Sequence, residues 1–423
     1  MKMLMRLGCL LLCALMLCAC VPQHFADIPQ DPMEPPFADS LIITERYSEP
    51  EDPAQRLAWR RDMVESKMRQ MMSMLWTPEE DIVYSHNEQP QYLKAGRIYR
   101  GMPYAHGSGS GMSFLSFATA RDENGVYTIS GLNGERMTGE VNVAHISNDC
   151  ADAVFWAWAT VSNSIRFVST NRMTAYQGCI PVGSYVCDRI TYSTSTKPIL
   201  EANGKNTMLE CYAQMQKGDG VVRFTDGGQG HAMMISALHI VQTDKGTIDP
   251  ENSYALVLDQ VSGNLANEIN YRDESIGETI YVASGVDTKY SFQDLFDLGY
   301  LPVTCKELID PAPLLEESIT DSVDTFTYEY LLSGRLESNY RISHAQMVIQ
   351  DSKGNEVQRA IGYNRESDMF SFRLSQLKGN SAVVTNCGTI DPDALPAGTY
   401  RCILSCTVST GRTVTVRDFT FTK

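Results

Sequence analysis

The sequence predicts an α+β body followed by an all-β domain. Helical and strand patterns alternate in the central part of the chain, whereas only short strand-like segments follow Pro311-Ala-Pro313. One helix followed by antiparallel strands is typical of an α+β unit. The 423 residues exceed one ordinary domain, so we expect two globular units and a tether. The expected segments are residues 1–20 as a signal, 21–53 as a stalk, 54–310 as the body and 311–423 as the β domain.

Residues 1–20 have the pattern of an export signal. Lys2 and Arg6 precede an apolar run from Leu7 to Leu17, which is too short for a stable membrane span. The ending Leu17-Cys-Ala-Cys20 resembles the lipobox of bacterial lipoproteins, and this resemblance implies a lipid on Cys20. We therefore expect a cell-envelope protein anchored by that lipid to the outside of the cytoplasmic membrane. A plain secretory signal is the alternative.

The next two segments predict a stalk and a long helix. Seven prolines, the last of them Pro53, follow Cys20 among acidic and polar residues, which favours a flexible chain. From Ala54 to Leu75 apolar residues recur at helical spacing, and Thr77-Pro78 predicts the end of the helix. Its methionines are expected to fill the core.

Patterning also places the other elements. In the body we expect a helix at Cys150 to Val161 and strands at Val221 to Phe224, Ala232 to Val241 and Tyr254 to Val261. In the last 110 residues or so, the predicted strands are Thr325 to Leu332, Ala345 to Gln350, Met369 to Leu374, Thr399 to Val408 and Thr413 to Phe421. Short strands at this spacing suggest an immunoglobulin-like β-sandwich.

Charge and cysteine usage restrict the partners. The formal net charge of −16 predicts an acidic surface that repels nucleic acid. No cysteine or histidine spacing resembles a zinc site, and we expect neither a metal nor a cofactor. Cys402 and Cys406 lie about 13 Å apart on one strand, too far for a disulfide. Bridges from Cys179 to Cys187 or from Cys387 to Cys402 remain open, as do buried free thiols.

Cys150 is the candidate nucleophile. Asn148-Asp149-Cys150 stands at the predicted start of a helix, with Asp149 as a plausible cap and an apolar face after it. The first turn of a helix offers free backbone N–H groups and the positive end of the dipole, which favour a thiolate.

His231 is the candidate base. It follows a glycine-rich loop, Thr225 to Gly230, and opens a predicted strand. If this strand forms a hairpin turning near Lys245-Gly246, His231 faces the neighbourhood of Gln260. We therefore expect Gln260 or Asp259 to orient the imidazole, and the register favours Gln260.

These motifs resemble the NlpC-type, papain-like cysteine peptidases. In that family the nucleophile follows an Asp and opens a helix, and a glycine-rich loop delivers the histidine; Ala151 and Asp152 stand where the family usually has Ser and Gly. Arg100-Gly-Met-Pro-Tyr104-Ala-His-Gly107 resembles the family's Gly-x-Pro-Tyr-x-x-Gly element. The resemblance implies that Tyr104 lies beside the nucleophile, and we expect Tyr104 and Asp149 to contact the substrate. About forty residues then separate this element from Cys150, which we interpret as a specificity loop.

The expected function is hydrolysis of an amide bond in peptidoglycan stem peptides through a thioester on Cys150. The family resemblance implies the γ-D-glutamyl bond to the diamino acid, and an amidase cutting between sugar and peptide is a close relative. The alternative is a non-catalytic lipoprotein that binds muropeptide or an envelope partner through the papain-like unit and the β-sandwich.

Overall fold

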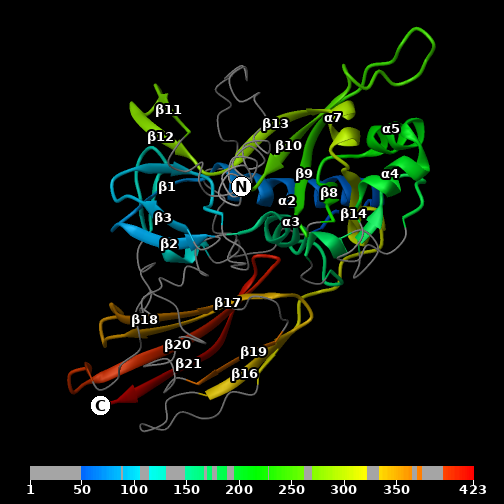
Figure 1. Ribbon diagram of the computed structural model, residues 1–423. Coiled ribbons are helices and arrows are strands. Elements are labelled where there is room, and N and C mark those ends of the chain that lie inside the picture. Colours follow the sequence, from blue (N-terminus) through cyan, green and yellow to red (C-terminus); the bar gives the residue numbers. More distant parts are fainter. Residues whose placement is uncertain are drawn as a thin grey trace, which may run out of the picture. The chain divides into compact units, whose positions relative to one another are not determined.

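The computed structural model is a mixed α/β structure, mostly β-sheet with few helices (Figure 1). It describes residues 49–86, 89–104, 114–129, 148–165, 169–173, 179–187, 195–226, 228–261, 269–321, 333–363, 369–373 and 394–423. These residues belong to the compact unit Ile42–Lys423. The signal segment, Cys20, most of the stalk, Cys387 and the strand expected at 325–332 lie outside the described residues.

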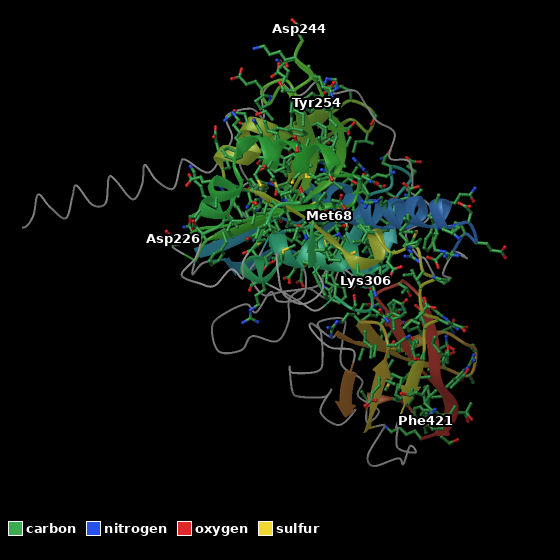
Figure 2. All side chains as sticks on the ribbon, turned by 90° about the vertical axis from the view of Figure 1, so that its right-hand side faces the viewer. Met68, Asp226, Asp244, Tyr254, Lys306 and Phe421 are labelled. Atoms are coloured by element: carbon green, nitrogen blue, oxygen red, sulfur yellow. The ribbon has the colours of Figure 1, made fainter. Side chains whose placement is uncertain are left out.

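Helix α2 (Pro53–Ser73) is the long helix expected from the apolar spacing. Asp52 caps it by accepting hydrogen bonds from the amides of Ala54 and Gln55, and Pro53 occupies the first helical position, where its missing N–H costs nothing. Met68, in the interior of the unit in Figure 2, is fully buried, as are Met71 and Met72, whereas Met63 is partly buried against the same cluster. The methionines therefore fill the core, as expected.

The central sheet holds six antiparallel strands in the order β13-β10-β9-β8-β14-β7. Their bounds are β7 (Cys179–Pro181), β8 (Gly220–Phe224), β9 (Gly230–His239), β10 (Tyr254–Asp259), β13 (Gly285–Ser291) and β14 (Leu301–Cys305). The expected hairpin joins β9 to β10, with Asp244 in its protruding loop (Figure 2). Strand β7 forms one edge, so part of the segment between Cys150 and His231 extends this sheet.

Short helices pack around the central sheet. They are α3 (Cys150–Trp158), η3 (Thr170–Arg172), α4 (Lys197–Asn203), α5 (Lys205–Gln214), α7 (Phe292–Asp297) and η4 (Lys306–Leu308). Helix α3 packs against both α2 and β9, and all nine of its residues are buried. A Cβ on Gly220 would come 3.1 Å from the ring of Trp158, so a glycine lets β8 and this helix approach closely.

A second six-stranded sheet was not expected from the sequence. Its order is β11-β12-β4-β1-β6-β5, built from β1 (Leu75–Pro78), β4 (Ile98–Arg100), β5 (Ala118–Arg121), β6 (Tyr127–Ile129), β11 (Asn270–Asp273) and β12 (Glu278–Val282). A hairpin of β2 (Ile82–His86) and β3 (Gln89–Leu93) and a turn, η2 (Phe114–Phe117), accompany it. Residues 114–129, expected in one long loop, therefore contribute strands. Strands of three to five residues are too short to show a clear alternation.

The C-terminal region forms two antiparallel sheets. One holds β15 (Ile319–Asp321), β16 (Ser333–Ser338) and β19 (Met369–Arg373); the other holds β17 (Ile342–Gln350), β18 (Glu356–Tyr363), β20 (Thr399–Val408) and β21 (Thr413–Thr422). Leu336 of the first sheet and Met347 and Leu404 of the second belong to one buried cluster. A separate buried cluster runs from Val64 to Leu308.

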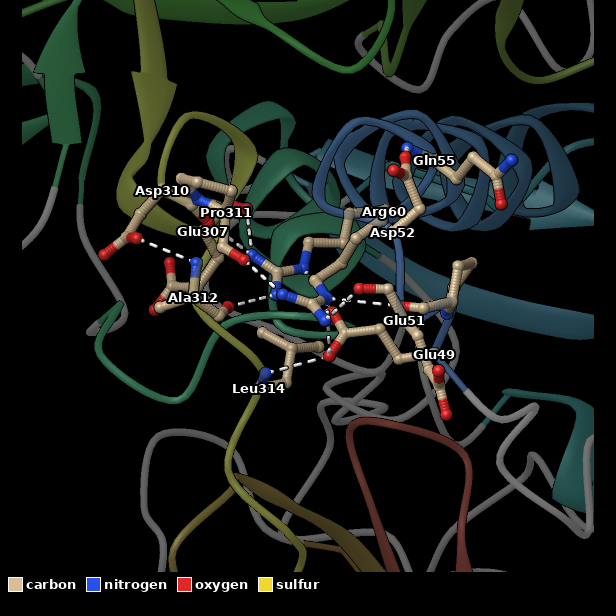
Figure 3. Close-up of polar contacts among 12 residues, drawn as sticks. Glu49, Glu51, Asp52, Gln55, Arg60, Glu307, Asp310, Pro311, Ala312 and Leu314 are labelled. Atoms are coloured by element: carbon tan, nitrogen blue, oxygen red, sulfur yellow. Dashed lines mark hydrogen bonds and ion pairs between the residues drawn. The ribbon is translucent and has the colours of Figure 1, made fainter.

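Arg60 ties α2 to the segment that follows β14 (Figure 3). Its side chain is 1% exposed and pairs with Glu49. Backbone groups complete the cluster: the carbonyls of Glu307, Asp310 and Ala312 accept from Arg60, and the amide of Leu314 donates to Glu49. A buried guanidinium needs this many acceptors, so the first helix and residues 307–314 are fixed together.

Among the described residues, no helix is both long and apolar enough to cross a membrane.

Candidate active site

Cys150 is the first residue of α3, and the cap next to it fixes its position. The Asp149 carboxylate accepts a 2.8 Å hydrogen bond from the amide of Asp152, whose own carboxylate faces back to the Asp149 amide at 3.5 Å. The Cys150 side chain is held at the positive end of a buried helix. Asp149, expected to contact substrate, serves as the cap in this structure.

His231 and Asp259 form a close pair. His231 is the second residue of β9, Asp259 is the last of β10, and Nε2 of the imidazole lies 2.8 Å from Oδ1 of the carboxylate. Asp259 is almost fully buried, whereas the His231 side chain remains 18% exposed. A buried carboxylate therefore holds a histidine that is still partly exposed to solvent.

The preference for Gln260 as the orienting residue is wrong. Leu258 lies opposite Met234 on β9, so counting back along β9 brings His231 opposite Val261. Residues two apart share a face, which puts Asp259 on the side of the imidazole. Irregular pairing between Leu256 and Val257 shifts the register from the one that a regular hairpin predicts.

Gln260 instead holds the segment that carries Tyr104. Its side-chain amide is fully buried and donates to the carbonyl of Met102 at 2.9 Å, and the hydroxyl of Ser284 donates to the same carbonyl at 3.2 Å. Tyr104 also forms a parallel bridge with Asn148, two residues before the nucleophile. The hydrogen bonds to the Met102 carbonyl and the bridge to Asn148 thus hold Tyr104 next to the segment that carries Cys150.

Tyr104 points its hydroxyl at the Cys150 thiol. Its oxygen lies 4.0 Å from Sγ of Cys150, and the side chain is buried. Burial raises the pKa of Tyr104 strongly, and the negative charges of Cys150 and Asp149 raise it further. The hydroxyl therefore stays protonated and is a hydrogen-bond donor beside the sulfur.

The histidine is positively charged over the neutral range. Burial by itself lowers the pKa of His231, but the charges of Asp259 and of a Cys150 thiolate, with hydrogen bonds to both, raise it to about 10. Because Nε2 faces Asp259, Nδ1 is the nitrogen left for the thiol. The geometry therefore suits a thiolate–imidazolium pair with a carboxylate behind it.

Two further side chains border His231 that sequence reasoning left without a role. Arg223 of β8 is its cross-strand partner, and the Tyr300 ring centroid lies 6.4 Å from that of the imidazole. Arg223 lies in the predicted strand Val221 to Phe224, just before the glycine-rich loop, so pairing of that strand with the one opened by His231 was the signal that would have found it. Tyr300 lies 69 residues further on and had no such signal.

Two histidines that flank the sequence motifs, His106 and His145, lie outside the described residues. Every cysteine in the described part other than Cys150 is also a free thiol, and burial raises the pKa of Cys179 to about 12 and that of Cys305 well above its usual value. Within the same described ranges, no three His, Cys, Asp or Glu side chains gather as metal ligands.

Comparison with known proteins gives distant likenesses. No protein-family model matches the chain, and no curated protein is significantly similar to it. Two crystal structures of wild-type OgpA from Akkermansia muciniphila match 28% of this chain and 32% or 33% of theirs, at 16% identity and a TM-score of 0.18. Catalytically inactive OgpA in complex with an O-glycopeptide (glycodrosocin) substrate matches 35% of this chain and 38% of its own, at 14% identity and a TM-score of 0.17. The chain thus matches about a third of the length of these structures, a likeness too distant to bear on fold or function.

Proposed function

We propose that this protein is a cysteine hydrolase of the cell envelope, with a papain-like body of the NlpC type, that cleaves amide bonds in peptidoglycan stem peptides. The observation that carries the proposal is the grouping of Cys150, His231 and Asp259 at the ends of three separate elements. Acyl transfer through a thioester uses a nucleophile, a base and an acidic group that orients the base. Cys150, His231 and Asp259 supply these three groups.

The residues divide the reaction between them. The Cys150 thiolate attacks the scissile carbonyl, forming a C–S bond, and the negative charge on the carbonyl oxygen meets the Tyr104 hydroxyl. His231 gives its proton to the leaving nitrogen as the C–N bond breaks, which leaves a thioester and a neutral imidazole. Water then loses a proton to His231 and attacks the thioester. Breakage of the C–S bond releases the acid and restores the ion pair.

The substrate class is supported by the beginning and the middle of the sequence together. An ending that resembles a lipobox at Cys20 supports a location of the body at the cell wall, and the resemblance of the motifs to the NlpC type implies the γ-D-glutamyl bond to the diamino acid. Full-length charge of −16 argues against attraction to an anionic wall as the basis of binding. Recognition must therefore come from the site itself.

Digestion of purified peptidoglycan, followed by mass spectrometry of the fragments, tests the proposal. The wild-type protein should release peptides cut at one type of amide bond, and Cys150→Ala should release at most about a thousandth as much. Cys187→Ala, which removes a partly exposed thiol of the described chain, is the matched control and should keep full activity. Activity that survives in Cys150→Ala overturns the assignment of the nucleophile. A stably folded wild-type protein that binds muropeptide without cutting it favours the non-catalytic alternative.

Thiol reactivity gives an independent measurement. At near-neutral pH, iodoacetamide should label Cys150 far faster than Cys211 or Cys305, because burial raises the pKa of both of those thiols. Peptide mapping of the labelled protein reads out the three sites at once. Equal labelling of all three contradicts an activated thiolate at Cys150.

A further inference from the structure

A basic side chain stands directly beside the histidine. In the β8–β9 pairing, Arg223 is the cross-strand partner of His231. Directly opposed residues on antiparallel strands project from the same face with their Cβ atoms about 5 Å apart. Arg223 is partly exposed, so its guanidinium borders the site instead of being sealed in the core.

The ring of Tyr300 lies under that guanidinium, and Tyr290 packs against this ring in turn. The guanidinium carbon lies over the ring of Tyr300, 5.3 Å from the centroid, and the centroid of Tyr290 is 6.3 Å from that of Tyr300. Both rings are buried. A guanidinium stacked on an aromatic ring keeps its N–H groups free at the edge, and fewer rotamers remain to be lost when a ligand binds.

Within the described ranges, the charge of Arg223 has no partner of opposite sign. Arg61 and Arg69, the comparable arginines of the same unit, contact Asp219 and Asp287 at 2.9 and 2.8 Å. In the described part of the chain, by contrast, Arg223 makes no hydrogen bond or ion pair through its side chain, and nearby Asp259 is engaged by His231. In a protein with 51 acidic residues, a guanidinium that lies over an aromatic ring next to the histidine and has no acidic partner among the described residues is a preformed site for an anion.

We propose that Arg223, supported by Tyr300, determines specificity by receiving a free carboxylate of the substrate next to the scissile amide. This rests on the proposed function and narrows its substrate class. The preferred substrates are peptides in which a residue flanking the cleaved bond keeps a free carboxylate, as a γ-linked glutamyl residue does at its α-carbon. Conversion of that group to a carboxamide removes the charge that the guanidinium binds.

Binding measured without turnover tests this directly. Full-length Cys150→Ala protein is titrated calorimetrically with two synthetic stem tripeptides, identical except that the α-carboxylate of the γ-D-glutamyl residue is free or amidated. The free acid should bind about 10- to 100-fold more tightly, as expected for charge-assisted hydrogen bonds. Adding Arg223→Leu should make the two affinities equal, because it weakens binding of the free acid and leaves binding of the amide unchanged. Arg223→Lys should retain part of the preference for the acid.

Matched controls separate the site from general effects. Arg121 also lies over a tyrosine ring, that of Tyr127, at 5.3 Å, but on β5 of the other sheet. Arg121→Leu should leave the preference for the acid intact. Thermal unfolding of each variant checks that the fold persists, and the comparison of acid with amide in Cys150→Ala alone does not depend on any change at Arg223.

The outcomes distinguish the two proposals. Equal affinity of Cys150→Ala for both peptides, binding of neither, or an unchanged preference in Arg223→Leu overturns the carboxylate site. Discriminating binding together with a wild-type protein that cuts neither peptide overturns the hydrolase and keeps the site. If the wild-type protein cuts both peptides at equal rates and Arg223→Leu does not change these rates, the carboxylate site is overturned and the hydrolase is kept.

Discussion

Asp259 faces Nε2 of His231 at 2.8 Å and gives the imidazole its orientation. Asp259→Ala should therefore lower turnover about a hundred- to ten-thousandfold, because the ring loses the group that fixes its tautomer and stabilises its charge. Initial rates on a peptidoglycan peptide measure the effect, with Gln260→Ala as the neighbouring comparison. If Gln260→Ala proves the more damaging change, Asp259 does not have this role.

The same pair sets the pH dependence. Because the pKa of His231 is raised to about 10, the imidazolium and the activity that needs it should persist through neutral pH and fall as pH rises through about 10. Asp259→Asn removes a negative charge that raises this pKa, so the alkaline limb of kcat/KM should move to lower pH. Profiles of kcat/KM from pH 5 to 11 for wild type and Asp259→Asn measure this shift. Identical alkaline limbs would contradict an effect of Asp259 on the pKa of His231.

The stability of the fold should depend on pH in the same direction as the activity. A folded-state pKa above the unfolded value of 6.5 means that the contribution of His231 to stability is fully present below about pH 6.5. It is then lost as pH rises through about 10. Urea unfolding of wild type and Asp259→Asn over this window should show a difference that shrinks with increasing pH.

Gln260 should act through Tyr104. Gln260→Ala removes one of two donors to the Met102 carbonyl and loosens the segment that aims the tyrosine, so kcat should fall about tenfold. In a Tyr104→Phe background the same change should cause no further fall. The alkaline limb set by His231 should stay where it is. A full additional loss in that background would show that Gln260 acts independently of Tyr104.

Two glycines with similar backbone angles should differ in their tolerance. Gly101 has φ +81°, and a Cβ there would come 2.6 Å from the carbonyl oxygen of Met72 and 2.7 Å from Ser284. Gly96 has φ +75° with nothing within 4 Å. Gly96→Ala should cost about 1 kcal/mol of unfolding free energy from backbone strain, and Gly101→Ala distinctly more because backbone must also shift. Equal costs in urea unfolding would contradict this reading of the contact.

The lipid anchor remains a prediction from sequence. Cys20→Ser should shift the protein from the membrane fraction to the soluble fraction and abolish labelling by a fatty-acid probe, because the acceptor thiol is lost. Cys18→Ser, two residues earlier, is the control and should change neither. Continued lipid labelling of Cys20→Ser would refute the assignment.

Sequence patterning located the elements with strong local signals. Helix α2 and strands β8, β9 and β10 appear within a few residues of their expected positions, because amphipathic spacing, caps and glycine turns act locally. The second sheet was missed because its strands are short and are joined by long-range pairing, as when β12 runs parallel to β4. Local pattern has no access to such pairing.

In the candidate site, too, local sequence predicted some residues and long-range pairing determined the others. The candidate nucleophile and base are found from adjoining residues, because a helix start and a glycine-rich loop are both readable along the chain. The choice between Asp259 and Gln260 depended on one irregularity in the β9–β10 pairing, which reverses the facing side chain without leaving a mark in the sequence.

The Arg60 cluster also bears on the order in which the polypeptide matures. Arg60 and its acceptor at Ala312 are 252 positions apart, so α2 and Glu49 emerge from the ribosome long before the carbonyl acceptors of the guanidinium are synthesised. Until then the guanidinium has Glu49 but lacks the carbonyls that complete its hydrogen bonds, which makes its burial costly. We therefore expect docking of the segment after β14 to be a late step in assembly of the body, and contacts of such long sequence separation make that step slow.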